Sequence, residues 1–335
     1  MKSHLVLLVM VFPCAASTAA AEGGFLFSTF RDDPTPASEQ IYFGISPDGR
    51  HWDALAGGRP VLVSDVGEQG ARDSFLLRAH DSQKVWLIAT DLCIARNRSW
   101  HRATHSGSRS IVVWETDDLV HWSPARLVQV APDDAGCAWA PEAIYDPETR
   151  DYLVYWASFT GRDMFARNRI WAARTKDFRT FEKPFIYLER REHVVDIHIM
   201  RDGDTFYRFT KDDKVKTISM AKSQRLMGPW EDIPQFTAGQ GNDSEGPICY
   251  RLPPTAGDGQ PPEWCVLLDN LGARIGPGKR CYEPFVSHDL NSGLFTPATD
   301  FHFPYPFRHG SVLPITTAER ERLESTYGEP QKPTS

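Results

Sequence analysis

The sequence of 335 residues contains no cysteine cluster, no excess of positive charge and no apolar run of membrane-spanning length. Its six cysteines form no C-x-x-C pair and no His/Cys cluster with zinc spacing, so a structural zinc site is not expected. Lys and Arg number 37 against 44 Asp and Glu, and the net charge of −7 argues against nucleic acid or an anionic membrane as a partner. An acidic protein with 12% aromatic residues can still bind neutral ligands such as sugars by stacking.

The longest apolar run, residues 5–12, is too short to span a bilayer. Lys2 precedes this run, and Ala19-Ala20-Ala21 follows it as an A-x-A cleavage site. We therefore predict that residues 1–21 are a signal peptide, that the mature protein is secreted or periplasmic, and that it has no membrane contact after cleavage. In such an oxidising compartment one or two disulfides are possible, with one thiol left over. The cysteines concerned are Cys93, Cys137, Cys249, Cys265 and Cys281.

Long helical periodicity is also scarce before residue 316. Short alternating segments, rich in β-branched and aromatic residues and bounded by Gly, Pro, Asp or Asn, recur instead, and this pattern is typical of strands. The clearest of these segments are 41–45, 85–88, 111–114, 152–156, 205–209 and 265–268.

A turn signature repeats along the chain. It opens with Ser or Thr and an Asp, which suit a tight turn, and it closes with an aromatic residue that we expect to pack between sheets. Three clear copies span residues 46–52, 116–122 and 175–181, and two looser copies span 223–230 and 287–295. The closing aromatic residues are 70, 59, 49 and 65 positions apart. Five repeats of about four strands predict an all-β fold, a five-bladed β-propeller.

The two ends of the chain are expected to meet in one blade. The first turn has only two strands before it, 25–30 and 41–45, whereas the other turns have three. Segment 309–315 can supply the missing innermost strand and close the ring. We therefore predict one propeller domain over residues 22–316 and a polar, peripheral tail over 317–335 that is helical at its start.

Each predicted innermost strand has an ionisable residue just before its apolar run. Because these strands line the central channel of a propeller, the side chains should converge on the axis. Carboxylates crowded at one channel mouth shift one another's pKa values, which suits an acid and a base for glycoside hydrolysis. The alternative is that they cap strand ends, join a structural ion network or bind a structural cation. The residues are Asp73, Glu142, Asp196, Glu245 and His309, at intervals of 69, 54, 49 and 64.

Five ordered segments resemble glycoside hydrolase family 43, the five-bladed arabinofuranosidases, xylosidases and arabinanases. They are RDSFLL (72–77), GCAWAPEAIYD (136–146), VVDIHIMRDGDTFYRFTKD (194–212), SEGPI (244–248) and RHGSVLPIT (308–316). The resemblance implies that Asp73 is the general base, that Glu245 is the general acid of an inverting reaction, and that Asp196 orients the acid and modulates its pKa. Ser74 and Ile197 depart from the family pattern, since proline is usual at the first position and Pro or a small residue is common at the second. The loss of proline should loosen the aim of the carboxylate.

Six further residues are candidates for substrate binding, each with a structural alternative. Trp139 could stack on the sugar or belong to the core, and Arg72 could offset the field at Asp73 or form a surface ion pair. Arg308 could bind a hydroxyl group or balance the acidic cluster. In some relatives a histidine at the axis lies next to a cation, so a structural calcium ion is possible beside His309, although no cofactor is required. The six candidates are Arg72, Trp139, Glu142, His198, Arg308 and His309.

The expected function is therefore that of an exo-acting glycosidase that removes a terminal sugar, with α-L-arabinofuranosyl as the first choice. A β-D-galactofuranosidase, a β-xylosidase, a retaining fructosidase of a related clan and a non-catalytic carbohydrate-binding propeller are alternatives. The choice of sugar depends on the walls of the pocket, chiefly loops 92–107, 159–168 and 272–279. The Arg- and His-rich segment 96–105 forms either a rim of the pocket or a solvated loop.

Overall fold

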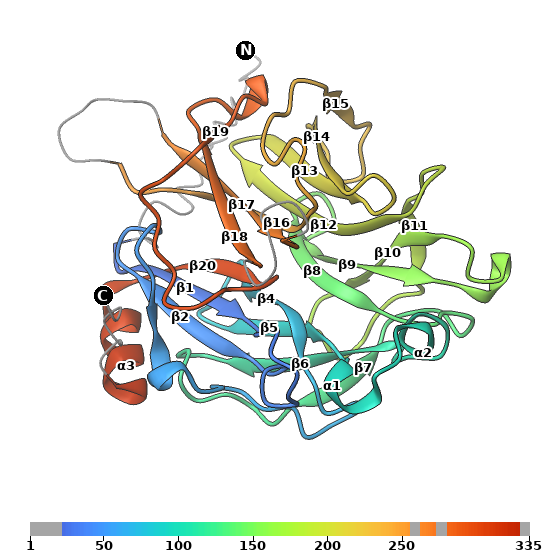
Figure 1. Ribbon diagram of the computed structural model, residues 1–335, viewed down its shortest axis with the longest axis horizontal. Helices are drawn as coiled ribbons and strands as arrows, with labels where there is room; N and C mark the ends of the chain where they lie inside the picture. The colour runs from blue at the N-terminus through green and yellow to red at the C-terminus, as the bar shows by residue number, and fades with distance from the viewer. Residues whose placement is uncertain (1–21, 255–261, 273–279, 329–335) are drawn as a thin grey trace, which may run out of the picture.

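Five four-stranded antiparallel sheets surround a central axis in the computed structural model (Figure 1). The structure describes residues 22–254, 262–272 and 280–328. The predicted five-bladed β-propeller is confirmed. The predicted signal peptide, residues 1–21, lies outside the described residues. Among the described helices, none is long and apolar enough to cross a membrane.

The blades are numbered in the order in which their repeated turns occur along the chain, and the strands of each blade are given from the axis outward. Blade 1 contains β20 (Ser311–Ile315), β1 (Gly24–Thr29), β2 (Tyr42–Ser46) and β3 (Asp53–Ala54). Blade 2 contains β4 (Arg72–Arg78), β5 (Val85–Thr90), β6 (Ser110–Thr116) and β7 (Arg126–Gln129). Blade 3 contains β8 (Trp139–Asp146), β9 (Asp151–Phe159), β10 (Asn168–Thr175) and β11 (Phe185–Leu188).

The last two blades follow the same plan. Blade 4 contains β12 (Val194–Asp202), β13 (Thr205–Asp212), β14 (Thr217–Ser223) and β15 (Glu231–Ile233). Blade 5 contains β16 (Ser244–Arg251), β17 (Trp264–Asn270), β18 (Cys281–Ser287) and β19 (Thr296–Pro297). Short helical elements decorate the loops: η2 (Leu55–Gly58), α1 (Ile94–Asn97), α2 (Trp100–His105), η3 (Gly161–Asp163) and η4 (Leu290–Ser292).

Blade 1 joins the two ends of the chain, as predicted. Strand β1 pairs antiparallel with β20, from Gly24 opposite Ile315 to Ser28 opposite Ser311, and on its other side with β2. The hydroxyl groups of Ser28 and Ser311 lie 3.0 Å apart. The ring is therefore closed by backbone hydrogen bonds between segments at opposite ends of the sequence.

The repeated turns form through the side-chain hydrogen bonds that their sequence predicts. In blade 2, Thr116 Oγ1 accepts a hydrogen bond from the backbone N–H of Leu119 at 3.1 Å, and Asp118 Oδ1 accepts from those of Val120 and His121 at 3.0 and 2.8 Å. Ser46 with Asp48 and Thr175 with Asp177 do the same in blades 1 and 3. The closing Trp122 packs against Phe43 of blade 1, with 6.0 Å between ring centroids.

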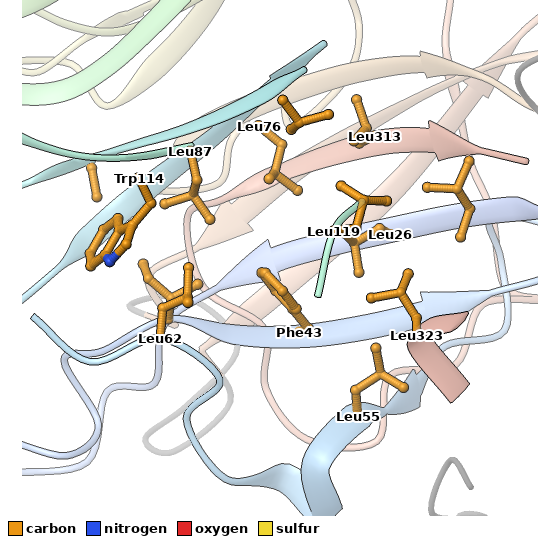
Figure 2. Close-up of a cluster of buried hydrophobic side chains, with 14 of the residues drawn as sticks. Leu26, Phe43, Leu55, Leu62, Leu76, Leu87, Trp114, Leu119, Leu313 and Leu323 are labelled. Carbon is orange, nitrogen blue, oxygen red and sulfur yellow. The ribbon is translucent and has the colours of Figure 1, made fainter. Parts of the chain in front are cut away.

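Apolar side chains fill the spaces between neighbouring blades. Figure 2 shows the cluster between blades 1 and 2, where Leu26, Phe43 and Leu313 face Leu76 and Leu87. The C-terminal tail contributes to it, because helix α3 (Thr317–Tyr327) places the fully buried Leu323 in this cluster. A capping box between Thr316 and Glu319 starts the helix. The tail is thus helical at its start, as predicted, and is held against blades 1 and 2.

The disulfides considered from the sequence do not form within the described part of the chain. Cys93, Cys137, Cys249 and Cys265 are buried thiols, and Cys281 is half-buried and likewise forms no disulfide. Burial raises the pKa of the Cys137 and Cys265 thiols to about 12, which keeps these groups protonated and unreactive.

Candidate active site

A pocket of about 300 Å³ opens where the innermost strands begin. Three carboxylates predicted to be catalytic, those of Asp73, Asp196 and Glu245, line this one pocket. Of the six predicted substrate-binding residues, Arg72, Trp139 and His309 line it, whereas Glu142, His198 and Arg308 do not. The other lining residues are Leu92, Trp100, Thr104, Ala140, Phe159, Asn168, Val195, Lys211 and Asp213.

A bulge at the start of four innermost strands aims side chains into the pocket. The pairing register shifts there in β4, β8, β12 and β16. One residue in each bulge is left-handed: Asp73 (φ 50°), Ala140 (φ 46°), Asp196 (φ 48°) and Gly246 (φ 52°). A left-handed residue other than glycine costs about 1–2 kcal/mol, and such strain is concentrated at functional sites. The bulges therefore serve to direct Asp73 and Asp196.

The bulges show that the predicted acidic residues do not all stand at the same position of their strands. The equivalent positions are Asp73, Ala140, Asp196 and Gly246, so Glu142 lies two residues beyond its predicted place and Glu245 one residue before it. The strand ends converge as predicted, but the acidic side chains do not occupy equivalent positions in the four strands. Each of the four bulges adds one residue without a partner opposite, so the bulges stay in step from blade to blade, and the strands differ in which position of the bulge carries the acidic residue.

Asp73 is held by the neighbouring strand and the next blade. Its Oδ2 accepts a hydrogen bond from Thr90 Oγ1 at 3.0 Å, and Thr90 Oγ1 in turn accepts one from the backbone N–H of Ala140 at 2.8 Å. Asp73 Oδ1 lies 3.7 Å from His309 Nδ1. Because Thr90 is fully buried, this chain of hydrogen bonds fixes the carboxylate against blade 3.

Asp196 is buried and supports the backbone next to Glu245. Its Oδ2 accepts a hydrogen bond from the N–H of Gly246 at 3.1 Å, and its Oδ1 lies 3.8 Å from His309 Nδ1. Burial raises the pKa of Asp196, and the positive charges of His309 and Lys211 oppose this only in part. Through its hydrogen bond with Gly246, the Asp196 carboxyl group contacts the residue that directly follows Glu245.

Glu245 lies between two cations. Its Oε2 accepts a hydrogen bond from Lys211 Nζ at 2.9 Å, and its Oε1 lies 3.4 Å from Arg308 Nη2. Burial acts to raise its pKa, but Lys211 and Arg308 outweigh burial and lower the pKa of Glu245 to about 2. In the absence of substrate Glu245 is therefore ionised.

Arg308 and His309 form the positive side of the acidic cluster. Arg308 is buried, and its Nε donates to Asp269 Oδ1 and Oδ2 at 3.0 and 2.8 Å, while its Nη1 lies 2.6 Å from Asp32 Oδ2. Burial raises the pKa of Asp269 to about 6 despite this contact. Burial opposes the charged form of His309, yet the carboxylates of Asp196 and Asp73 raise the pKa of its imidazole.

Glu142 and His198 lie behind the pocket, in a buried layer of the channel. His198 Nδ1 is 2.9 Å from Glu142 Oε2, and the hydroxyl group of Tyr155 donates to the same oxygen at 3.3 Å. The other ring nitrogen of His198 faces the carbonyl oxygen of Cys249 at 3.3 Å. These contacts satisfy both residues within the protein, so direct sugar contact by either residue stays a prediction.

Aromatic residues form the rim. Trp100 of α2 is 54% exposed and meets Trp139 of β8 edge to face, with ring centroids 6.2 Å apart. The guanidinium of Arg72 lies 5.5 Å from the Trp100 ring and donates to Glu39 Oε1 at 2.7 Å. The Arg- and His-rich segment thus contributes to the rim. Residues 273–279 of the third wall loop lie outside the described part of the chain.

Ser74, where the family pattern has proline, connects two blades. Its hydroxyl group is buried and donates to Ser28 Oγ at 3.0 Å, and Ser28 Oγ lies 3.0 Å from Ser311 Oγ. Ser311 Oγ accepts a hydrogen bond from the backbone N–H of Leu76 at 2.8 Å. The three hydroxyl groups join β4 to β1 and β20, so strand β4 is anchored directly after Asp73.

We expect Ser74→Ala to lower the free energy of unfolding by about 1 kcal/mol, because it removes one buried hydrogen bond between blades. Urea denaturation of this variant and of wild type measures the change, and Ser82→Ala, at an exposed serine, is the control. Equal stability of Ser74→Ala and wild type would show that the hydroxyl network does not anchor β4.

Lys211 and Asp269 belong to the site but were not among the predicted residues. Both lie on the second strand of a blade, β13 and β17, whereas the predicted ionisable residues all belong to innermost strands. For Asp269 the available signal was a charged side chain in the otherwise apolar strand β17, since a buried charge requires a partner. Strand β13 also carries Arg208 and Asp212, so its sequence does not single out Lys211. Within the described residues, no three His, Cys, Asp or Glu side chains are grouped to hold a metal ion, so calcium stays a prediction.

Comparisons with known proteins agree with this geometry. The sequence model of a family described as a "Probable glycosyl hydrolase domain", related to glycoside hydrolase family 43, matches residues 21–321. An alpha-L-arabinofuranosidase of Bifidobacterium longum subsp. longum is 30% identical over 177 residues, which cover 47% of this chain. The match spans only 16% of that relative's length.

Two solved structures share the fold. One is an exo-1,5-alpha-L-arabinanase from a bovine ruminal metagenomic library, with a TM-score of 0.55, 14% identity, and coverage of 82% of this chain and 92% of its own. The other is a mutant alpha-L-arabinanase of Cellvibrio cellulosa, with a TM-score of 0.54, 14% identity, and coverage of 82% and 90%. Because the family model matches residues 21–321 and the fold is shared, the chain belongs to the glycoside hydrolase family 43-related family.

Proposed function

We propose that the protein is a secreted, exo-acting, inverting α-L-arabinofuranosidase. The observation that supports this most is a pocket of about 300 Å³ with Asp73, Asp196 and Glu245 around one space. This volume is at the lower end for small-molecule sites and suits a single terminal sugar. Behind it the channel is filled by buried side chains such as Glu142 and Tyr155, which favours entry of a chain end from one side.

In the proposed reaction Asp73 acts as the general base. Its ionised carboxylate takes a proton from a water molecule that attacks the anomeric carbon, while Glu245 gives a proton to the departing oxygen. Asp196 holds the N–H of Gly246 and so fixes the backbone that carries Glu245. His309, between Asp73 and Asp196, limits their mutual repulsion. No cofactor is required.

The choice of sugar rests on the relatives rather than on the pocket walls. The sequence relative described above is named an alpha-L-arabinofuranosidase, and the two solved structures described above are named arabinanases. β-D-Galactofuranosides and β-xylosides are the alternative substrates. The edge-to-face pair of Trp100 and Trp139 at the rim offers an aromatic surface for the sugar or alcohol beyond the cleaved bond.

A non-catalytic carbohydrate-binding propeller is the second candidate. The observation that favours it is the ion pair of Glu245 with Lys211, which holds the predicted acid ionised in the empty pocket. A permanently ionised Glu245 could accept hydrogen bonds from a sugar but could not protonate a leaving group.

A panel of 4-nitrophenyl glycosides separates these functions. We expect release of 4-nitrophenol from the α-L-arabinofuranoside, with lower rates on the β-D-galactofuranoside and the β-D-xylopyranoside. A preference for one of the latter two would reassign the sugar. Binding of oligosaccharides without cleavage of any member would support the non-catalytic propeller instead. N-terminal sequencing of the exported protein tests secretion, with cleavage expected after Ala21.

A further inference from the structure

Lys211 is a buried cation shared by two carboxylates of the pocket. Its side chain on β13 is 4% exposed, and its Nζ lies 2.9 Å from Glu245 Oε2 and 3.2 Å from Asp213 Oδ1. Glu245 and Asp213 both line the pocket. Because a buried ammonium group is costly without a partner, Lys211 must remain paired with at least one of them.

Lys211 is the principal charge partner of Glu245. Arg308, which precedes β20, lies farther away at 3.4 Å and is already paired with Asp269 and Asp32. The remaining ionisable groups that face this region are His309 beside β20, Asp196 on β12 and Asp73 on β4. Of all these groups, only Lys211 makes a short contact with Glu245 and also has a second carboxylate in reach.

This contact conflicts with the chemistry expected of Glu245. A general acid must carry a proton when the substrate is bound, whereas an ammonium group at hydrogen-bond distance favours the carboxylate. Asp213 can resolve this conflict, because its carboxylate can pair with Lys211 when Glu245 is neutral. Asp213 also binds Lys216, at 2.6 Å, so it stays in place at the edge of the pocket.

We propose that Lys211 is a positioning residue that sets the protonation state of Glu245. With the pocket empty it holds Glu245 as a carboxylate, and when substrate binds it moves to Asp213, so that Glu245 takes up one proton from solvent. That proton passes to the departing oxygen as the glycosidic bond breaks, and Glu245 becomes a carboxylate again. Lys211 keeps its three protons throughout. The second step rests on the proposed function, whereas the first does not.

Infrared difference spectra of protein with ¹³C-labelled glutamate carboxyl groups test the first step without any substrate. At about pH 5 the spectrum of Lys211→Met minus that of wild type should contain an additional protonated-carboxyl band, which should be absent when Lys211→Arg or the double variant Lys211→Met/Glu245→Gln replaces Lys211→Met. Lys216→Met, which removes a cation from Asp213 but not from Glu245, is the matched control and should resemble wild type. If Lys211→Met does not fold, Lys211→Gln replaces it. A spectrum of the folded variant without this band would overturn the proposal.

Leaving-group dependence tests the second step. Removing the alternative partner in Asp213→Asn should hold Lys211 on Glu245 and impair proton donation. The ratio of kcat/KM for a 2,4-dinitrophenyl glycoside, which needs little acid assistance, to that for a phenyl glycoside should therefore rise by about 10-fold or more. An unchanged ratio would overturn the movement to Asp213. If wild type cleaves no glycoside, the proposed function fails, while the infrared result still decides the charge state of Glu245.

Discussion

Asp73→Asn is expected to lower kcat/KM by about 10²–10⁴-fold, the contribution typical of a general base, while the protein stays folded. Asparagine has nearly the same shape, tolerates the left-handed backbone at this position, and can accept the hydrogen bond from Thr90 through its amide oxygen. It cannot take a proton from the attacking water. Initial rates on the aryl glycoside that wild type cleaves best, together with the Tm, measure both effects.

The control for this variant is Asp65→Asn, at an exposed aspartate away from the pocket. It should retain wild-type activity. If Asp73→Asn kept more than about a tenth of the wild-type kcat/KM, Asp73 would not be the base. Its bulge and its contact with Thr90 would then be structural features of the strand entry.

Arg308→Met is expected to cause the largest loss of stability, about 3–5 kcal/mol at pH 7, because breaking a buried ion pair leaves a charge without compensation. The group left behind is Asp269, which is fully buried and whose carboxylate both binds Arg308 and accepts the backbone N–H of His309. Thermal unfolding should show a Tm several degrees below that of wild type. Arg225→Met, at an exposed pair with Glu148, should leave the Tm nearly unchanged.

The cost of Arg308→Met should shrink as the pH falls. Burial already raises the pKa of Asp269 to about 6 in the wild type, and loss of Arg308 raises it further. Since the folded state then binds this proton more tightly than the unfolded state, stability increases on acidification below the folded pKa, down to the ordinary pKa of an aspartate near 4. Tm values of the variant relative to wild type at pH 7 and pH 5 check this. A deficit that grew at pH 5 would contradict it.

The sequence predicted those features of the fold that depend on local chemistry. Each of the three clear turn copies is closed by its own Ser or Thr and Asp, as at Thr116 and Asp118, so its signature lies within a few residues. The ring closure followed from counting strands before the first turn, and the pairing of β1 with β20 confirms it.

The details of the site depend on contacts that the sequence does not mark. The bulge in β8 places Ala140 in a left-handed conformation without a glycine or aspartate to signal it, so Glu142 was assigned to the wrong position in the repeat. Lys211 meets Glu245 across 34 positions of sequence, and Asp269 meets Arg308 across 39. Only the three-dimensional arrangement of second and innermost strands brings such pairs together.

We propose that Asp73, Asp196 and Glu245 perform an inverting hydrolysis in one pocket. Proton NMR of the first product formed by wild-type protein decides this, because the anomeric signal records the direction of attack. With an α-L-arabinofuranoside as substrate, we expect β-L-arabinofuranose to appear first and the α anomer to follow by mutarotation. Appearance of the α anomer first would indicate a retaining reaction and would contradict the role of Asp73 as a base that activates water.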